Sequence, residues 1–250
     1  MLLGAANGTN TVTIVLAHDV PAAGSLQLAF NCLWTQNSGF LAPTSCVDSN
    51  GHAWTISTSG LPLIGLTQEN SNPVQRMQVG SVGRACAAGD LHAGDTVTLT
   101  FTARTGEVCA AVLVHVPVPF TAVAQAGGGP GIEYFNGDSW PADSFDTSTS
   151  LDWSVAFHGI LPTVEANAVM VTAMGAYPAV AGFTPYLGTV IGEIATGTVS
   201  VAFAQAPVAA HSSPNPGGTW PSARTMLAGN YQFMTAPTLA HAHYRSGSRT

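Results

Sequence analysis

The sequence predicts an all-β protein, a jelly-roll-like β-sandwich of about ten or more short antiparallel strands with no long helix. Three observations support this fold class. Apolar residues recur with a period of two along most of the chain, which is the spacing of a strand with one buried face. Turn-forming residues punctuate these runs at short intervals, with 27 Gly and 16 Pro in 250 residues. No long segment shows the 3.6-residue period of an amphipathic helix.

The clearest strands lie in the first half of the chain. In the segment 96–103, Val97, Leu99 and Phe101 alternate with threonines, which predicts a strand with one wet face. The segment 108–116 is apolar almost throughout and predicts a strand that is buried on both faces. We expect further strands at residues 11–16, 25–34, 75–87, 151–157, 168–174, 189–194, 198–205 and 222–234.

A β-hairpin is expected around Asn50 and Gly51. This dipeptide supplies the positive-φ turn that a short hairpin loop needs. Val47 before the turn and Trp54 after it would be the apolar anchors of the two strands.

The pattern favours a single β-sandwich domain over residues 1–235, without an internal repeat. Residues 117–150 are the least regular part of the chain, and we interpret them as a long loop across one end of the sandwich. Residues 236–250 form a C-terminal tail that is either flexible or docked on a partner.

Composition predicts association and excludes one class of partner. Only 8 % of the residues are charged, against about a quarter in a typical soluble domain, while 46 % are hydrophobic. Other subunits are therefore expected to cover some of the surface, as in a homo-oligomer. The six bases are all Arg and the net charge is −7, which argues against nucleic-acid binding. Because Lys is absent, it cannot block edge-to-edge pairing of strands, so closure or partner contacts must do so.

No membrane or export signal is expected. No stretch approaches the roughly 18 consecutive apolar residues of a membrane-spanning helix. Residues 1–6 are too short for the core of a signal peptide and have no basic residue before them. We therefore expect synthesis in a cytoplasm without membrane insertion, unless a leader has been removed.

The four cysteines, all in the first half, show no C-x-x-C spacing, so a structural zinc site is not expected. Buried free thiols are the favoured interpretation. One or two disulfides are the alternative if the protein works outside a cell. The residues concerned are Cys32, Cys46, Cys86 and Cys109.

No catalytic signature stands out, so no enzyme activity and no cofactor are expected. Gly137-Asp138-Ser139 matches the nucleophile motif of one esterase class, but it lies mid-chain and no Asp-x-x-His follows. A glycosidase needs two carboxylates across a cleft. No strand pattern pairs any of the glutamates, which are Glu69, Glu107, Glu133, Glu165 and Glu193.

No metal site is expected either. His241 and His243 would share one face of a strand, but no third ligand lies near them in the sequence. Asp90 and Asp95 flank a Gly-rich turn and could hold calcium, yet their spacing matches no dedicated calcium loop. An Asx-type turn is the default interpretation.

Several aromatic and histidine residues are candidates for ligand or interface contacts. Trp140 and Trp220 lie beside prolines in expected loops, where a rigid ring often anchors an interface. Trp34, Trp54 and Trp153 lie in strand patterns and are expected in the core. The full set of candidate contacts is Trp140, Trp220, Tyr134, Phe135, His241, His243 and Tyr244.

The order of motifs resembles a β-sandwich family of bacteriophage virion proteins. These motifs are V-D-x-x-G-x-x-W at residues 47–54, A-G-D-T-V-T-L-T-F at 93–101, an Ala/Val strand at 110–116 and A-N-A followed by apolar residues from 166. They are similar to those of tail and minor tail proteins of phages that infect actinobacteria. The absence of Lys is compatible with a GC-rich genome.

This resemblance implies a non-enzymatic structural protein of the virion, made in the host cytoplasm. Its partners would be copies of itself, neighbouring virion proteins and a host surface glycan. The alternatives are a carbohydrate-binding receptor-binding tip, with specificity in loops 127–150 and 210–220, and a capsid decoration protein. A secreted hydrolase ranks last.

Overall fold

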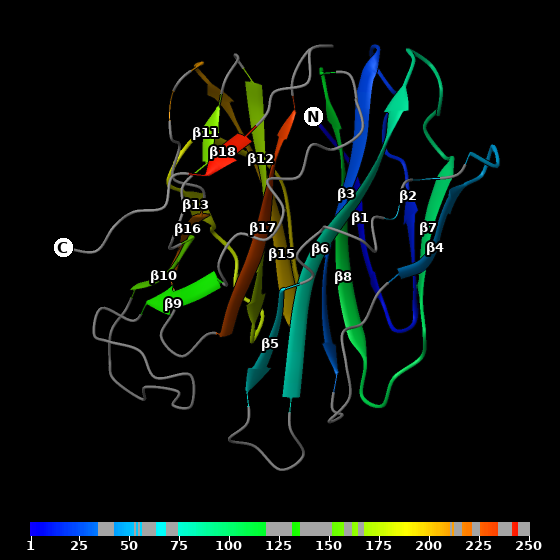
Figure 1. Ribbon diagram of the computed structural model, residues 1–250. Helices are drawn as coiled ribbons and strands as arrows, with labels where there is room; N and C mark the ends of the chain where they lie inside the picture. Colours follow the sequence, from blue (N-terminus) through cyan, green and yellow to red (C-terminus); the bar gives the residue numbers. More distant parts are fainter. Residues whose placement is uncertain are drawn as a thin grey trace.

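The computed structural model describes residues 1–34, 43–52, 54, 56, 64–68, 75–118, 132–135, 152–157, 162–164, 168–210, 212, 217–221, 226–234 and 242–244. The secondary-structure elements within these ranges are all strands, and all strand pairs are antiparallel (Figure 1). The predicted all-β fold is therefore confirmed. The described residues form no helix that could span a membrane.

The first half of the chain builds two sheets. Sheet A has the order β1-β8-β3-β6-β5, and sheet B has the order β2-β7-β4. The strands of sheet A are β1 (Leu2–Gly8), β8 (Val108–Val116), β3 (Gly24–Trp34), β6 (Gln75–Cys86) and β5 (Ile64–Gln68). Those of sheet B are β2 (Thr11–Val15), β7 (Thr96–Phe101) and β4 (Pro43–Asp48).

The second half builds two further sheets and a small strand pair. Sheet E has the order β14-β15-β12-β17, and sheet C has the order β13-β16-β10-β9. The strands of sheet E are β14 (Thr189–Thr196), β15 (Val199–Val208), β12 (Ala168–Tyr177) and β17 (Met226–Met234). Those of sheet C are β13 (Thr184–Pro185), β16 (Gly217–Pro221), β10 (Asp152–Phe157) and β9 (Ile132–Phe135). The remaining pair is β11 (Pro162–Val164) with β18 (Ala242–Tyr244).

The four large sheets are stacked in the order B, A, E, C, from right to left in Figure 1, with an apolar cluster between each neighbouring pair. Phe30 of β3 meets Phe101 of β7 between sheets B and A, with ring centroids 5.2 Å apart. On the opposite face of β3, Ala29 joins the cluster that contains Phe203 of sheet E. Sheet A is therefore covered on both faces. This explains why β3 is buried along its whole length and confirms the prediction of a doubly buried strand at 108–116.

The same strand order occurs twice in the chain. In the first half β7 pairs with β2 and β4, and in the second half β16 pairs with β10 and β13. The run β8-β3-β6-β5 of sheet A likewise matches the run β17-β12-β15-β14 of sheet E. The first strand differs, because β1 joins β8 whereas β9 joins β10. The sequence shows no repeat because this one lies in the pairing order of the strands and not in a shared residue pattern.

The two halves also pack reciprocally through sheets A and E. Strand β3 contacts its counterpart β12, β8 contacts β15, and β6 contacts β17. The last two contacts are equivalent once the halves are exchanged, so the arrangement has an approximate two-fold axis, as in an isologous dimer. The nested pairing of β1 with β8 and of β2 with β7 is compatible with a jelly roll. The jelly-roll assignment and the single domain over residues 1–235 stay predictions.

Three details differ from the expectations. The turn at Gly51 exists, with φ of 79°, but the described Trp54 lies outside any strand, and its backbone N–H donates to the carbonyl of Cys46 over 3.3 Å. Val47 is 45 % exposed, so it is not the expected apolar anchor. The expected loop 117–150 contains β9, and the expected tail contains β18.

A disulfide bond joins Cys32 to Cys109. These residues lie directly opposite each other on β3 and β8, with Cα atoms 4.1 Å apart, so the register of the pair brings the thiols together. Cys46 and Cys86 are free. The interpretation of all four cysteines as free thiols is therefore wrong for the first pair.

Candidate functional site

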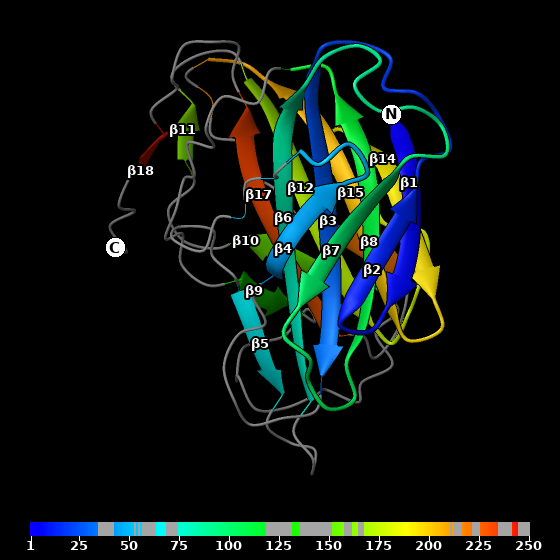
Figure 2. The ribbon, with the colours of Figure 1, turned by 90° about the vertical axis from the view of Figure 1, so that its right-hand side faces the viewer.

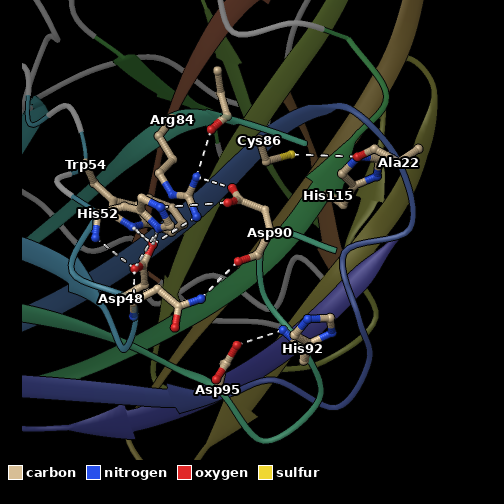
Figure 3. A network of polar contacts seen from close by, with 12 residues as sticks. Ala22, Asp48, His52, Trp54, Arg84, Cys86, Asp90, His92, Asp95 and His115 are labelled. Atoms are coloured by element: carbon tan, nitrogen blue, oxygen red, sulfur yellow. Dashed lines mark hydrogen bonds and ion pairs between the residues drawn. The ribbon is translucent and has the colours of Figure 1, made fainter. Parts of the chain in front are cut away.

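Titratable side chains gather at one end of β4 and β6 and in the loop that follows β6 (Figure 3). Together with the indole of Trp54 they form a group that we call the Asp48 cluster, and it consists of Asp48, His52, Trp54, Arg84 and Asp90. Asp48 is the last residue of β4, and the alternation of that strand turns Cys46 and Asp48 inward while Val47 faces out. The Asp48 side chain is fully buried.

Asp48 holds the turn that follows it. Its Oδ1 accepts hydrogen bonds from the backbone N–H groups of Asn50 and His52, at 3.2 and 3.0 Å. Its Oδ2 accepts one from the indole Nε1 of Trp54, at 3.2 Å. Gly51 lies between these donors with a positive φ, which glycine adopts without steric strain. The D-x-x-G-x-x-W motif is therefore a turn clamped by one buried carboxylate.

Arg84 compensates the charge of Asp48. Its Nη2 lies 2.9 Å from Asp48 Oδ2, and its Nη1 forms an ion pair with Asp90. Nη1 also donates to the carbonyl of Ala85 over 2.9 Å, and the guanidinium carbon lies 5.5 Å from the centre of the Trp54 ring. One cation thus serves two carboxylates and packs against the motif's tryptophan.

The electrostatics keep Asp48 ionised. Burial alone would raise the pKa of Asp48, because it penalises the charged form. The hydrogen bond from the His52 backbone, the Arg84 charge and the Trp54 indole outweigh burial and lower that pKa below its ordinary value. A buried carboxylate of this kind acts as a structural charge and not as a proton acceptor near neutral pH.

His52 is the most accessible member of the cluster, with a side chain that is 44 % exposed. Its Nδ1 lies 3.1 Å from Asp48 Oδ1, and its Nε2 lies 3.8 Å from Asp90 Oδ1. Among the described residues, the imidazole of His52 hydrogen-bonds to Asp48 alone. A general base needs a nucleophile or substrate proton within such reach. Within the part of the chain that the structure describes, the contacts of His52 orient its ring over the turn and assemble no catalytic triad.

The turn expected at Asp90 and Asp95 is present. Asp95 Oδ2 accepts the backbone N–H of His92 at 2.8 Å, and the backbone N–H of Asp95 donates to the carbonyl of His92 at 3.0 Å. Asp90 is committed to Arg84. Its carboxylate is therefore already neutralised by a guanidinium, which supports the turn interpretation and not a calcium site.

A second buried carboxylate lies beside the disulfide. Glu107 is 4 % exposed, its Oε2 accepts the backbone N–H of Arg104 at 3.0 Å, and its Oε1 lies 3.4 Å from Cys109 Sγ. Burial raises the pKa of Glu107 despite the hydrogen bond from Arg104. Cys32, Glu107 and Cys109 are close enough to hold a metal ion. The two sulfurs are bonded to each other, however, so they offer no thiolate to an ion.

The predicted contact residues that the structure describes lie on three strands, β16, β9 and β18. Trp220 lies in β16 and not in a loop, and its side chain is fully buried against Phe183, with ring centroids 4.6 Å apart. Its Nε1 donates to Glu193 Oε1 over 3.2 Å. This placement corrects the prediction, because β16 runs between β13 and β10 and turns the ring toward sheet E.

The other candidates are divided between two strands and the undescribed part of the chain. Tyr134 and Phe135 lie in β9, and His243 and Tyr244 lie in β18. Trp140 and His241 lie outside the described residues.

The D-x-x-G-x-x-W motif is visible in the sequence, whereas its partner Arg84 was not among the predicted site residues. A signal was present, because Arg84 is an isolated charge within an otherwise uncharged strand end in a chain with six basic residues. A charged residue in a buried strand needs a counter-charge. Which carboxylate provides it depends on the register of β4, β7 and the loop after β6, and no local pattern gives that register.

No family model matches the chain, and no curated protein matches it either.

Proposed function

We propose that this chain is a non-enzymatic structural protein of a bacteriophage virion, and specifically a minor tail protein that assembles with copies of itself or with neighbouring virion proteins. In this role it also contacts the host surface. The proposal rests on the virion-like motifs of the sequence together with the use that the fold makes of them.

The supporting observation is the saturation of the Asp48 cluster. This cluster is the densest group of titratable side chains among the described residues, and each member is paired with another member. Its carboxylates accept the hydrogen bonds of the turn and neutralise the charge of Arg84, so they are not available to a substrate. A motif whose charged groups stabilise a turn suits a structural protein better than an enzyme.

Assembly is supported by the charge content. A chain with 8 % charged residues and no Lys has few means of staying apart from its neighbours. The carbohydrate-binding alternative relied on Trp140 and Trp220, and the burial of Trp220 removes one of these rings from the surface. The capsid decoration alternative shares the same chemistry and differs in location.

The test is localisation on the particle. Antibodies raised against the purified chain should label the tails of intact virions of the phage that encodes it, and peptides of the chain should appear in the digested particle. Labelling of the head would favour the decoration protein. Absence of the chain from purified particles, together with a soluble glycan-hydrolysing activity, would overturn the proposal.

A further inference from the structure

Three sheet edges lie on one side of the stack. Strand β2 is an edge of sheet B, β1 is an edge of sheet A, and β14 is an edge of sheet E. Strand β1 contacts both β2 and β14, so the three edges follow one another across the layers, at the right of the view (Figure 2). We call this side the β2-β1-β14 edge.

The β2-β1-β14 edge carries almost no charge. Strands β1 and β2 contain no charged residue, and β14 contains only Glu193. Glu193 Oε1 accepts the backbone N–H groups of Gly182 and Phe183, at 2.9 and 3.2 Å, and the indole N–H of Trp220. Its charge is therefore directed into the fold. Proteins normally protect an edge with Lys, Pro or inward charges. These three strands contain neither Lys nor Pro, and Glu193 of β14 is their one inward charge.

The backbone of β1 is open over its second half. Among the described residues β1 has one strand partner, β8, and one outward bond, in which the Leu3 carbonyl accepts the backbone N–H of Ala17 at 2.7 Å. An irregularity between Leu2 and Gly4 confines regular pairing to residues 4–8. The side chains of Ala5 and Asn7 are exposed in this segment. A strand of small uncharged residues with open backbone groups is a template for another strand.

We propose that the β2-β1-β14 edge binds a second copy of this chain, with residues 4–8 of β1 pairing antiparallel with the same residues of the partner. A two-fold axis perpendicular to the sheets maps each layer onto itself and reverses strand direction. It therefore brings β1 to β1 and aligns β2 and β14 with their own counterparts. This inference rests on the proposed function, since it assigns a surface to the self-association proposed there.

The size of the edge suits such a contact. The three layers are about 10 Å apart and a strand rises about 3.3 Å per residue, so strands of 5, 7 and 8 residues give an edge of roughly 500–700 Å². A stable interface covers about 800 Å² on each partner, so the estimate approaches that size. Two isologous copies would extend sheet A across the axis without a change in the fold.

The test compares lysine variants of the whole chain by light scattering over a range of concentrations. Ala5→Lys and Ala195→Lys place a cation on exposed positions of β1 and β14. Val47→Lys is the matched control, because Val47 is exposed on β4, at the opposite edge of sheet B. We expect the unchanged chain and Val47→Lys to be dimers, and we expect the two edge variants to dissociate at least about tenfold more readily.

Hydrogen exchange in the unchanged chain is a second test, and it does not depend on whether the lysine variants fold. In the unchanged chain, the amides of residues 4–8 that do not bond to β8 should gain protection as the concentration rises, while those of β4 should not. This inference would be overturned if the edge variants remained dimers and the amides of residues 4–8 gained no protection. The chain would then assemble through another surface. A monomer at every concentration would overturn this inference and the self-association in the proposed function together.

Discussion

Arg84 Nη2 lies 2.9 Å from Asp48 Oδ2, and both side chains are at most 9 % exposed. This pair links the end of β4 in sheet B to the end of β6 in sheet A, so it joins the two sheets of the first half at one corner. The Trp54 ring contacts the same guanidinium, which places the D-x-x-G-x-x-W turn on the pair. The motif thus holds sheets A and B together at one corner of the sandwich.

Replacing Asp48 should destabilise the fold strongly. Asp48→Asn keeps the volume but leaves Arg84 buried with one counter-charge fewer, and breaking such a pair costs about 3–5 kcal/mol. Urea denaturation measures the loss. The control is Asp95→Asn, which weakens one turn and should cost about 1 kcal/mol or less. Similar losses for both variants would show that Asp48 contributes only to its turn.

Acid should unfold the protein partly through Asp48. Because the pKa of Asp48 is lower in the folded state than in the unfolded chain, its contribution is present above the unfolded value, about 4. That contribution is lost as the pH falls through the folded pKa. Melting temperatures measured from pH 6 down to pH 2 should fall more steeply for the unchanged chain than for Asp48→Asn. Parallel curves would contradict the shift.

The pH dependence of stability that is linked to Glu107 should have the opposite sign to that of Asp48. Its folded pKa is raised by burial, so the stability linked to this group is fully present below the unfolded pKa and is lost as the pH rises through the folded pKa. Glu107→Gln removes that loss and still accepts the N–H of Arg104. We expect a higher melting temperature than that of the unchanged chain at pH 7, and a smaller difference at pH 4. A lower melting temperature at pH 7 would refute the burial argument.

The disulfide is checked by counting thiols. Denatured without reductant, the oxidised chain should react with two equivalents of a thiol reagent, at Cys46 and Cys86, and with four after reduction. Loss of a native disulfide typically costs about 2–5 kcal/mol, so Cys32→Ala with Cys109→Ala should lower stability by that order. Cys86→Ala is the control and should change it little. Four reactive thiols without reductant would contradict the bond.

Gly175 tests the packing of sheet A on sheet E. A Cβ on this residue would overlap Val79 and lie 2.6 Å from Asn31 Cγ, both on sheet A. Gly175→Ala should therefore cost about 1–3 kcal/mol, as overpacking does. Adding Val79→Ala should recover part of that loss. Gly192→Ala is the control, since its nearest atoms lie at 3.0 Å and are the ends of side chains. A neutral Gly175→Ala would place the sheets farther apart.

The period-two patterns predicted much of the fold. Val97, Leu99 and Phe101 are buried on β7 as expected, and the uniformly apolar segment 108–116 is β8, buried almost throughout. These features are local, because a strand with one wet face and a strand with none differ in their own residues. The turn at Gly51 was also local, since positive φ favours glycine.

The tertiary structure decided what covers each face and which groups meet. Sequence alone favoured Val47 as the anchor of β4, whereas the register of β4 on β7 turns Asp48 inward to Arg84. The same kind of long-range register pairs Cys32 with Cys109 and buries Trp220 beneath sheet E. The alternation of apolar and polar residues along a strand predicts only that its two faces differ. The partner on each face comes from segments far away in the chain, so only the assembled sheets determine it.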